Sequence, residues 1–179
     1  MSIQDVRRLT NKLLTTVDEW EPEEWYPLAG YSVKGQSAGW FLKNILRRRE
    51  DPSGVYLFRT KFESKFEEVI KIPLQREIFY VGRAGKIARR LQRHLKVKKH
   101  NSASLVYKLT AMGMGMEANT RDSNMASERF RVRFCAVQSH LRDFCEMSYL
   151  EANNDETQAI IEILMSLKLR TQFNDWKTH

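Results

Sequence analysis

The feature that most constrains the fold is an abrupt change of hydrophobic period near the middle of the chain. Residues 78–81 (Ile-Phe-Tyr-Val) are β-branched or aromatic, which is typical of a strand. After Gly82 and Gly85, which permit a tight turn, apolar residues recur at helical spacing from Lys86 to Lys98. A strand that runs directly into a helix indicates a domain in which a sheet and helices share one core.

The periodicity of the whole chain predicts a small α/β (α+β) domain with an N-terminal helical extension. Strands are expected at residues 54–58, 77–82 and 131–137, the last because apolar and polar residues alternate there. They would form a mainly antiparallel three-stranded central sheet flanked by helices. The connection at residues 59–76 is too long for a tight hairpin, so it must be an extended loop or contain a small helix. Helices are expected at residues 2–17, 36–49, 86–98 and 155–169, and loops at residues 18–27 and 112–127.

Length and composition limit the class of protein. A chain of 179 residues is expected to form one domain, and its mean hydropathy of −0.54 speaks against a membrane-spanning protein. The first residues include Asp5 and paired arginines and do not resemble a secretory signal, so we expect a cytoplasmic protein with no membrane partner. Two cysteines without a CxxC motif cannot build a disulfide framework or a structural zinc site.

The positive charge is concentrated in one segment. Of the 30 basic residues, eight lie between Arg83 and Lys99, where there is no acidic residue. The other 22 are balanced by the 22 acidic residues, so this segment accounts for the net charge of +8. Such a concentration favours a polyanionic partner, with an ordinary solvated helix face as the alternative.

Three side chains within the expected helices indicate a site. Arg90 and His94 lie one turn apart at the edge of a buried stripe, so they should face the sheet beside Tyr80. In the helix expected at residues 155–169, Glu162 has apolar neighbours around much of the circumference. A carboxylate in that position needs a cation, either a basic side chain or a metal, unless a narrow polar strip keeps it solvated.

Taken in order along the chain, these residues resemble the signature of the GIY-YIG nucleases. The parts that carry the resemblance are the tripeptides Gly54-Val55-Tyr56 and Tyr80-Val81-Gly82 and the residues Arg90, His94, Glu162 and Asn174. The arginine stands ten residues after the second motif tyrosine, the histidine four residues later, and the asparagine twelve residues after the glutamate. The match covers about two-thirds of the chain, with a longer gap between the two tyrosine motifs than the family usually has.

The resemblance implies Mg²⁺-dependent hydrolysis of phosphodiester bonds in DNA. Glu162 would hold a single Mg²⁺, for which Mn²⁺ could substitute, and Arg90 would clamp the scissile phosphate. Tyr56 would act as the base or position the attacking water, and a base role requires its pKa to fall from about 10 to near neutrality. Tyr80 and His94 would complete the proton network, and which of the three groups takes the proton stays open.

The resemblance also implies how the chain is organised around DNA. Residues 1–52 would be an extension able to recognise DNA, added to a nuclease core at residues 53–179 with insertions at residues 59–76 and 97–128. Asn174 would order the C-terminal segment more than take part in the chemistry. Without a separate recognition domain, a restriction-enzyme-like DNA endonuclease is expected, and a homodimer could cut both strands. The residues expected to contact DNA are Arg83, Lys86, Arg93, Lys96, Lys98 and Lys99.

Three alternatives stay open. A structure-specific nuclease of DNA repair or recombination would apply the same chemistry to branched or damaged DNA. A catalytically silent nucleic-acid-binding module would keep the basic segment without the reaction, and the full set of motif residues speaks against it. An RNA-binding protein without chemistry is suggested by the basic segment alone.

Overall fold

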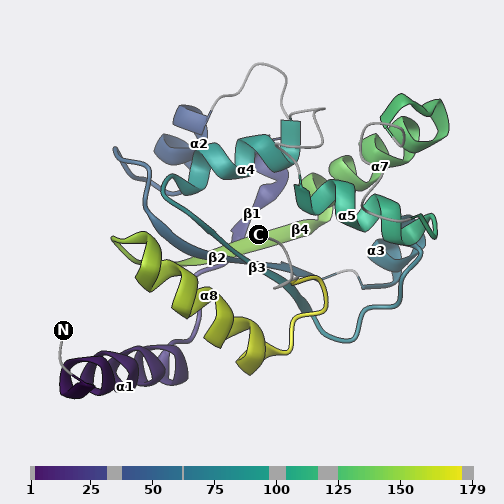
Figure 1. The fold of residues 1–179 in the computed structure, drawn as a ribbon. Coiled ribbons are helices and arrows are strands. Elements are labelled where there is room, and N and C mark those ends of the chain that lie inside the picture. Colours follow the sequence, from purple (N-terminus) through teal and green to yellow (C-terminus); the bar gives the residue numbers. More distant parts are fainter. Residues whose placement is uncertain (1–2, 32–37, 62, 97–103, 117–124, 175–179) are drawn as a thin grey trace.

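The structure is a computed structural model that describes residues 3–31, 38–61, 63–96, 104–116 and 125–174 (Figure 1). Helices surround one antiparallel sheet, so the expected α+β class is confirmed. The strands are β1 (Tyr26–Pro27), β2 (Gly54–Thr60), β3 (Ile78–Ala84) and β4 (Cys145–Glu151). The helices are α1 (Ile3–Glu19), the 3-10 helix η1 (Leu28–Tyr31), α2 (Ala38–Asn44), α3 (Glu63–Ile70), α4 (Ile87–Lys96), α5 (Ser104–Gly113), α7 (Glu128–Phe144) and α8 (Asp155–Leu169).

The sheet has four strands in the described part of the chain, whereas the sequence predicted three. Their order is β1-β4-β2-β3, and every neighbouring pair is antiparallel. Strand β2 lies in the middle, paired with β4 along its whole length, and all of its residues except Arg59 are buried. Strand β3 is therefore an edge strand, with one side free of any other strand.

The strand predicted at residues 131–137 is wrong, because these residues belong to helix α7. The hydroxyl of Ser127 caps α7 by accepting a hydrogen bond from the backbone N–H of Phe130. The third long strand is β4 instead, which follows α7 without a loop. In α7 the buried apolar side chains recur every three or four positions, and this helical stripe outweighs the local alternation. They are Phe130, Phe134, Val137 and Leu141.

The other predicted elements differ mainly in their ends. Helix α8 has the predicted bounds, and α1 continues two residues past the predicted end. The helix predicted at residues 36–49 is the shorter α2, and the backbone at Arg47 has a positive φ of 51°. Helix α4 ends at Lys96, so residues 97 and 98 of the predicted helix lie outside the described residues.

Three connecting segments contain structure that the sequence pattern did not specify. The connection at residues 59–76 contains α3, which is one of the two alternatives considered for it. The predicted insertion at residues 97–128 contains α5, whose last residues include the start of the predicted loop at residues 112–127. In the predicted loop at residues 18–27, Tyr26 and Pro27 pair with β4 as strand β1.

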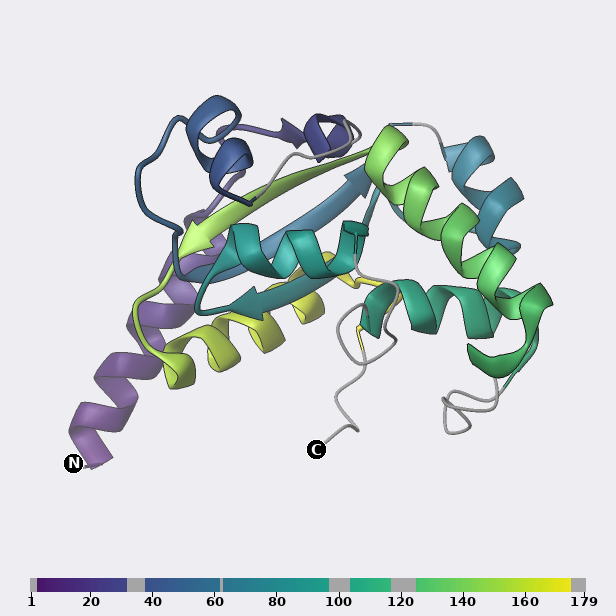
Figure 2. The same ribbon diagram turned by 90° about the horizontal axis from the view of Figure 1, so that it is seen from above.

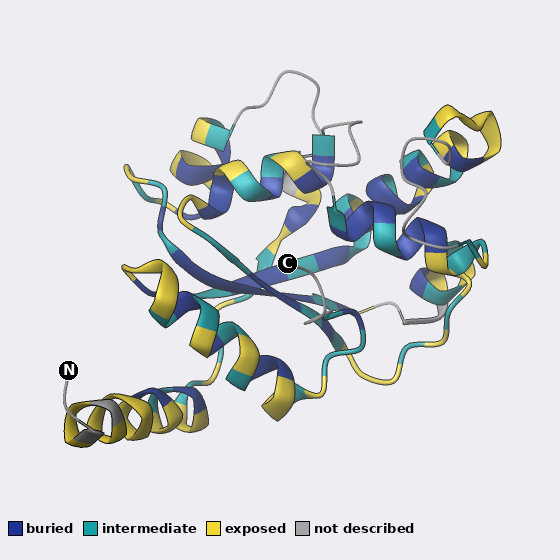
Figure 3. Cartoon of the chain, viewed as in Figure 1, coloured by how far each residue is buried: buried dark blue, intermediate teal, exposed yellow. Residues whose placement is uncertain are grey.

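The sheet is covered by helices on both faces (Figures 1 and 2). Side chains alternate along β2, so Tyr56 and Phe58 join the core formed with α2, α3, α4, α5 and α7. Val55 and Leu57 join a second core, formed with α1 and α8. The buried central strands separate the two cores (Figure 3). Among the helices of the described ranges, none has the length and apolar character needed to cross a membrane.

Two contacts hold the surroundings of β3 in place. The carboxylate of Asp51 accepts hydrogen bonds from the backbone N–H groups of Ala88 (2.7 Å) and Arg89 (3.1 Å), which caps the first turn of α4. At the free edge of β3, the side chain of Asn174 accepts from the N–H of Val81 at 2.9 Å and donates to its carbonyl at 2.6 Å. Asp51 thus fixes α4 beside the start of β2, and Asn174 covers the open edge.

Candidate functional site

A buried hydrogen bond joins the sheet to helix α4. Oη of Tyr56, on β2, lies 3.0 Å from Nε2 of His94, on α4, and both residues are 0% exposed. The ring of Tyr80, on β3, has its centroid 6.1 Å from that of Tyr56 and 6.4 Å from that of His94. Tyr80 is partly exposed, so this aromatic cluster of Tyr56, Tyr80 and His94 reaches the surface on one side.

Gly82 provides the space in which the aromatic cluster forms. It stands directly opposite Tyr56 in the pairing of β2 with β3. A Cβ atom at Gly82 would lie 2.7 Å from the Tyr56 hydroxyl oxygen and 2.8 Å from a ring carbon of Tyr80, which is closer than atoms of real side chains approach. The Tyr56 ring therefore crosses the position where a side chain of residue 82 would stand.

Arg90 places a positive charge beside both tyrosines. Its Nη2 donates a hydrogen bond to Oγ of Ser104 at 3.1 Å, whereas its Nε is buried with no hydrogen-bond partner among the described residues. Burial lowers the pKa of Arg90, but the hydroxyls of Tyr56 and Tyr80 outweigh burial and raise it, so the guanidinium stays charged. A charged guanidinium with an unsatisfied buried donor is suited to bind an anion.

Burial also sets the protonation of the aromatic cluster. It raises the pKa of Tyr56, an effect that the guanidinium of Arg90 opposes, and it raises the pKa of Tyr80 well above the usual value. Burial lowers the pKa of His94 well below the usual value, and the charge of Arg90 lowers it further. Near neutral pH both hydroxyls are therefore protonated and the imidazole is neutral. The chain alone does not supply the fall in pKa that a base role of Tyr56 requires.

Glu162 approaches the same edge of the sheet from α8. Its Oε2 lies 3.2 Å from Nε of Arg83, on β3, and its side chain is 19% exposed. Burial raises the pKa of Glu162, and Arg83 opposes this effect. The charge of Glu162 in turn raises the pKa of both Tyr56 and Tyr80, so the carboxylate lies within electrostatic reach of the aromatic cluster. The cation that this carboxylate needs is a basic side chain, Arg83.

The donor atoms at this edge fit Mg²⁺ better than a metal held by protein ligands alone. Within the described ranges, no group of three or more His, Cys, Asp or Glu residues is placed to share one metal ion. Mg²⁺ keeps several waters and is usually bound by one or two carboxylates together with substrate phosphates. Glu162 supplies one such carboxylate, and Arg83 competes for the same oxygen.

A basic cavity opens beside the aromatic cluster, with a volume of about 470 Å³. It is lined by Arg83, Ala84, Gly85, Lys86, Arg89, Arg90 and Arg93. Three of the expected DNA contacts, Arg83, Lys86 and Arg93, thus border one hollow, although Arg83 is also paired with Asp155 and Glu162. Lys96 is half-buried at the end of α4. Lys98 and Lys99 lie outside the described residues.

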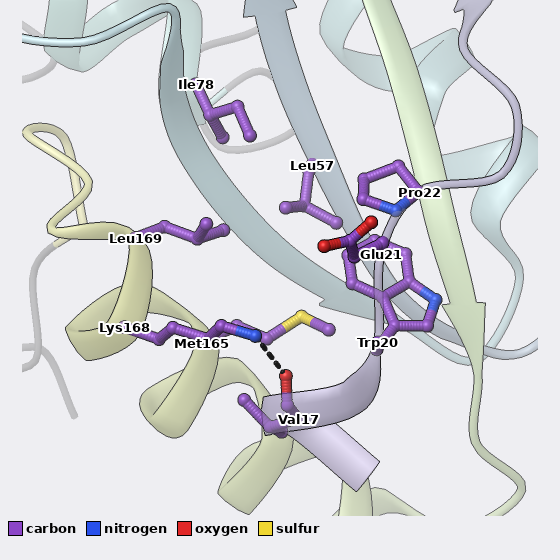
Figure 4. Close-up of a pocket in the computed structure, with 9 residues that line it drawn as sticks. All are labelled: Val17, Trp20, Glu21, Pro22, Leu57, Ile78, Met165, Lys168 and Leu169. Atoms are coloured by element: carbon purple, nitrogen blue, oxygen red, sulfur yellow. Dashed lines mark hydrogen bonds between the residues drawn. The ribbon is translucent and has the colours of Figure 1, made fainter.

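A second cavity lies on the opposite face of the sheet, between α1, α8 and the strands, with a volume of about 310 Å³ (Figure 4). Its lining is apolar apart from Glu21 and Lys168. Nζ of Lys168 donates to the carbonyls of Val17 (2.7 Å) and Asp18 (2.8 Å) at the end of α1. Because its lysine is engaged in this way, the cavity offers little chemistry, and we place the candidate site at the basic cavity.

The structure brings together most, but not all, of the site residues that the sequence predicted. Tyr56, Tyr80, Arg90 and His94 meet between β2, β3 and α4, and Glu162 reaches the same edge. Both polar ends of the Asn174 side chain are used in hydrogen bonds to Val81, which leaves it a structural role.

Two contributions were missed by the sequence analysis. The capping role of Asp51 was not predicted, because its hydrogen-bond partner Ala88 lies 37 positions later and no local pattern links the two. Arg83 was assigned to DNA contact alone, and its ion pair with Glu162 joins β3 to α8 across a wide sequence separation.

We predict that Gly82→Ala disrupts the aromatic cluster, because the added Cβ must push the Tyr56 ring away from His94. The free energy of unfolding should fall by about 1–3 kcal/mol, as measured by urea denaturation. Gly85→Ala is the matched control, since no atom lies within 4 Å of a Cβ at that position. Equal stabilities of the two variants would show that Tyr56 is not held as described.

We also predict a pH dependence of stability that comes from His94. Its pKa is lowered in the folded chain, so between that value and about 6.5 the unfolded chain binds more protons. The free energy of unfolding should therefore fall with decreasing pH below about 6.5, by up to about 1.4 kcal/mol per pH unit for this group. His94→Gln should reduce the slope, measured by urea denaturation at several pH values. The remaining slope would come from His140, whose pKa burial also lowers, and an unchanged slope would contradict the prediction.

No family model, no curated protein and no solved structure matches this chain. The candidate site therefore rests on the geometry of this chain. That geometry consists of a buried tyrosine–histidine hydrogen bond between β2 and α4, an arginine with an unsatisfied donor on the same helix, and a glutamate paired with Arg83 on the neighbouring strand β3.

Proposed function

We propose that this chain is a Mg²⁺-dependent endonuclease that hydrolyses phosphodiester bonds in DNA, with the chemistry of the GIY-YIG nucleases that its motifs resemble. The observation that supports this most is the meeting of Tyr56, His94 and Arg90 beside a basic cavity. Glu162 arrives at the same place from a helix on the other face of the sheet. The proposal thus assigns groups for proton transfer, anion binding and cation binding to one region of the molecule.

Arg90 is the group best placed to bind the scissile phosphate. It lines the basic cavity, and its unpartnered Nε is a donor that a phosphate oxygen would satisfy. Its Nη2 is held by Ser104, which fixes the plane of the guanidinium. A fixed planar donor stabilises the charge that develops on the phosphate oxygens as the water attacks.

Tyr56 and His94 form the proposed proton path. Tyr56 can accept a proton from water only after its own hydroxyl proton has left, and Nε2 of His94, 3.0 Å away, is the adjacent acceptor. For this transfer the imidazole carries its proton on Nδ1, leaving the lone pair of Nε2 toward the hydroxyl. Arg90 opposes the rise in the pKa of Tyr56 but also lowers the pKa of His94, so the transfer depends on the charge of the bound cation. Tyr80, at the exposed side of the aromatic cluster, would orient the water.

Glu162 is the proposed ligand for the divalent cation. A bound Mg²⁺ or Mn²⁺ would act as a Lewis acid on the phosphate and would favour ionised oxygens nearby. To offer both lone pairs of Oε2, Glu162 must give up its ion pair with Arg83. Arg83 would then keep its ion pair with Asp155, and its Nε would be free to contact the DNA backbone at the rim of the basic cavity, where it already lies.

Binding of the DNA backbone fits the distribution of charge. The basic cavity is bordered by exposed Arg89 and Arg93 on α4, one turn apart on its outer side. Contacts of this kind position the phosphate backbone and carry no sequence information. Sequence would have to be read by parts outside the nuclease core, for which residues 1–52 are the proposed source.

We predict that the wild-type chain nicks supercoiled plasmid DNA in the presence of Mg²⁺ and that Glu162→Gln abolishes nicking. The amide has nearly the same shape as the carboxylate and leaves the cations of the basic cavity in place, so DNA binding should stay within about twofold. Arg90→Ala should slow cleavage by about 10² or more, the typical cost of losing one transition-state contact. The nicking rates of the wild type and of each variant are measured from time courses at saturating protein, with the plasmid forms separated on gels.

The matched control for this experiment is Glu128→Gln, which removes an exposed carboxylate on α7. Its cleavage rate should equal that of the wild type. Undiminished nicking by Glu162→Gln would refute the proposed cation site. Loss of affinity without loss of turnover in Arg90→Ala would refute the phosphate clamp.

We predict in addition that DNA binding weakens steeply with salt, because cations of the basic cavity displace counterions from DNA. In a plot of log affinity against log salt concentration, Arg93→Ala should lower the slope by about one, since one phosphate contact is lost. Arg129→Ala, at an exposed arginine of α7, is the control and should leave the slope unchanged. The affinity at each salt concentration is measured by fluorescence anisotropy of a labelled duplex. Equal slopes for the two variants would show that α4 does not contact the DNA.

A further inference from the structure

Helix α8 carries a second apolar face, directed away from the sheet. Its inner face buries Ile161 and Met165, which are 3% and 1% exposed. Its outer face shows Ile160, Ile163 and Leu167, which are 39%, 42% and 64% exposed. These three residues are three and four positions apart, so they form one line along the helix, here called the α8 stripe. In Figure 3, exposed positions recur at intervals along α8, between intermediate and buried ones.

The α8 stripe ends in opposite charges. Glu156 stands four positions before Ile160 and continues the same line. Arg170 follows the last residue of α8 with a positive φ of 50°, so it lies at the C-terminal end of the stripe and not on the helical line itself. Both are exposed, and neither has an ion-pair partner among the described residues. They are about 21 Å apart along the helix axis and cannot pair within one chain. Each stands seven positions from Ile163, which is the midpoint of the line.

We infer that the α8 stripe binds a second copy of this chain, with two α8 helices antiparallel and crossing at Ile163. A two-fold axis through Ile163 places Ile160 of one copy against Leu167 of the other. The same rotation places Glu156 of one copy beside Arg170 of the other, twice in the dimer. A parallel arrangement would instead oppose Glu156 with Glu156 and Arg170 with Arg170, so the charges select the antiparallel one.

The chemistry of the α8 stripe favours this partner over others. Contiguous exposed aliphatic residues on the outer side of a helix mark an interaction surface. DNA is a poor occupant, since the stripe offers a single cation while the concentrated positive charge lies on α4. A second α8 supplies both matching aliphatic side chains and matching charges. Antiparallel helix dipoles add to the attraction.

The assembly is tested by sedimentation equilibrium of the full chain. The wild type should show a concentration-dependent mass rising from 21.1 kDa to twice that value. Leu167→Glu should be monomeric, because the dimer would bury two unpaired carboxylates. Val132→Glu is the matched control, since Val132 on α7 is 65% exposed and lies outside the stripe, and it should dimerise like the wild type. Circular dichroism and thermal unfolding of each variant confirm that it is folded.

Exchange of the end charges tests the antiparallel register. Glu156→Arg alone and Arg170→Glu alone should each weaken dimerisation by about tenfold, because two attractive contacts become repulsive. The double variant E156R/R170E should restore the wild-type dissociation constant, since opposite charges face each other again. Because these residues are too far apart to meet in one chain, restoration can arise only between copies.

Several outcomes would overturn the inference. A wild type that stays at 21.1 kDa over its whole soluble range would show that the stripe is uncovered or is covered by the chain's own residues. A dimer unaffected by Leu167→Glu would place the interface elsewhere, and a double variant no tighter than the single ones would refute the antiparallel register. The test of assembly measures masses and dissociation constants and involves no DNA cleavage. Its result is therefore independent of the proposed nuclease activity.

Discussion

The hydrogen bond between Tyr56 and His94 is the contact on which the arrangement around β3 depends. A hydroxyl and an imidazole buried in an apolar core must satisfy each other, since an unpaired polar group there costs about 1–3 kcal/mol. The bond forms only if α4 is positioned along β2 so that His94 lies opposite Tyr56, and the Asp51 cap helps to fix this position. It also requires that residue 82 has no side chain. Arg90, one turn before His94 on the same helix, is placed by the same contacts.

Elements with a purely local signal were predictable from the sequence, and elements decided by distant contacts were not. Helix α8 has the predicted bounds because Asn154 caps it and its apolar residues continue without a break. At residues 131–137, two local periods compete, and the helix prevails because α7 packs its buried apolar stripe into the core shared with α3 and α5. Strand β1 has only two residues, and its partners lie in β4 at the other end of the sequence, so nothing near Tyr26 specifies it.

The same distinction applies to the candidate site. The placement of Arg90 and His94 beside Tyr80 followed from helical spacing after a strand, which is a local argument. The hydrogen bond between Tyr56 and His94 depends on the register of β2 with β3 and on the absence of a side chain at Gly82. The ion pair of Arg83 with Glu162 was also not predictable. The sequence required a cation for this carboxylate and could not decide between a metal and a basic side chain.

Helix α8 connects the two proposals physically. Successive residues of a helix are about 100° apart, so Glu162 stands between the inner face, with Ile161, and the outer stripe, with Ile163. The position of its carboxylate relative to the aromatic cluster depends on how firmly α8 is held against β3. The inner contacts hold the helix from one side, and a second copy on the α8 stripe would hold it from the other. Assembly through α8 would therefore restrict the movement of the helix whose Glu162 must leave Arg83 to bind a cation. Dimerisation and cation binding would thus both depend on the position of α8.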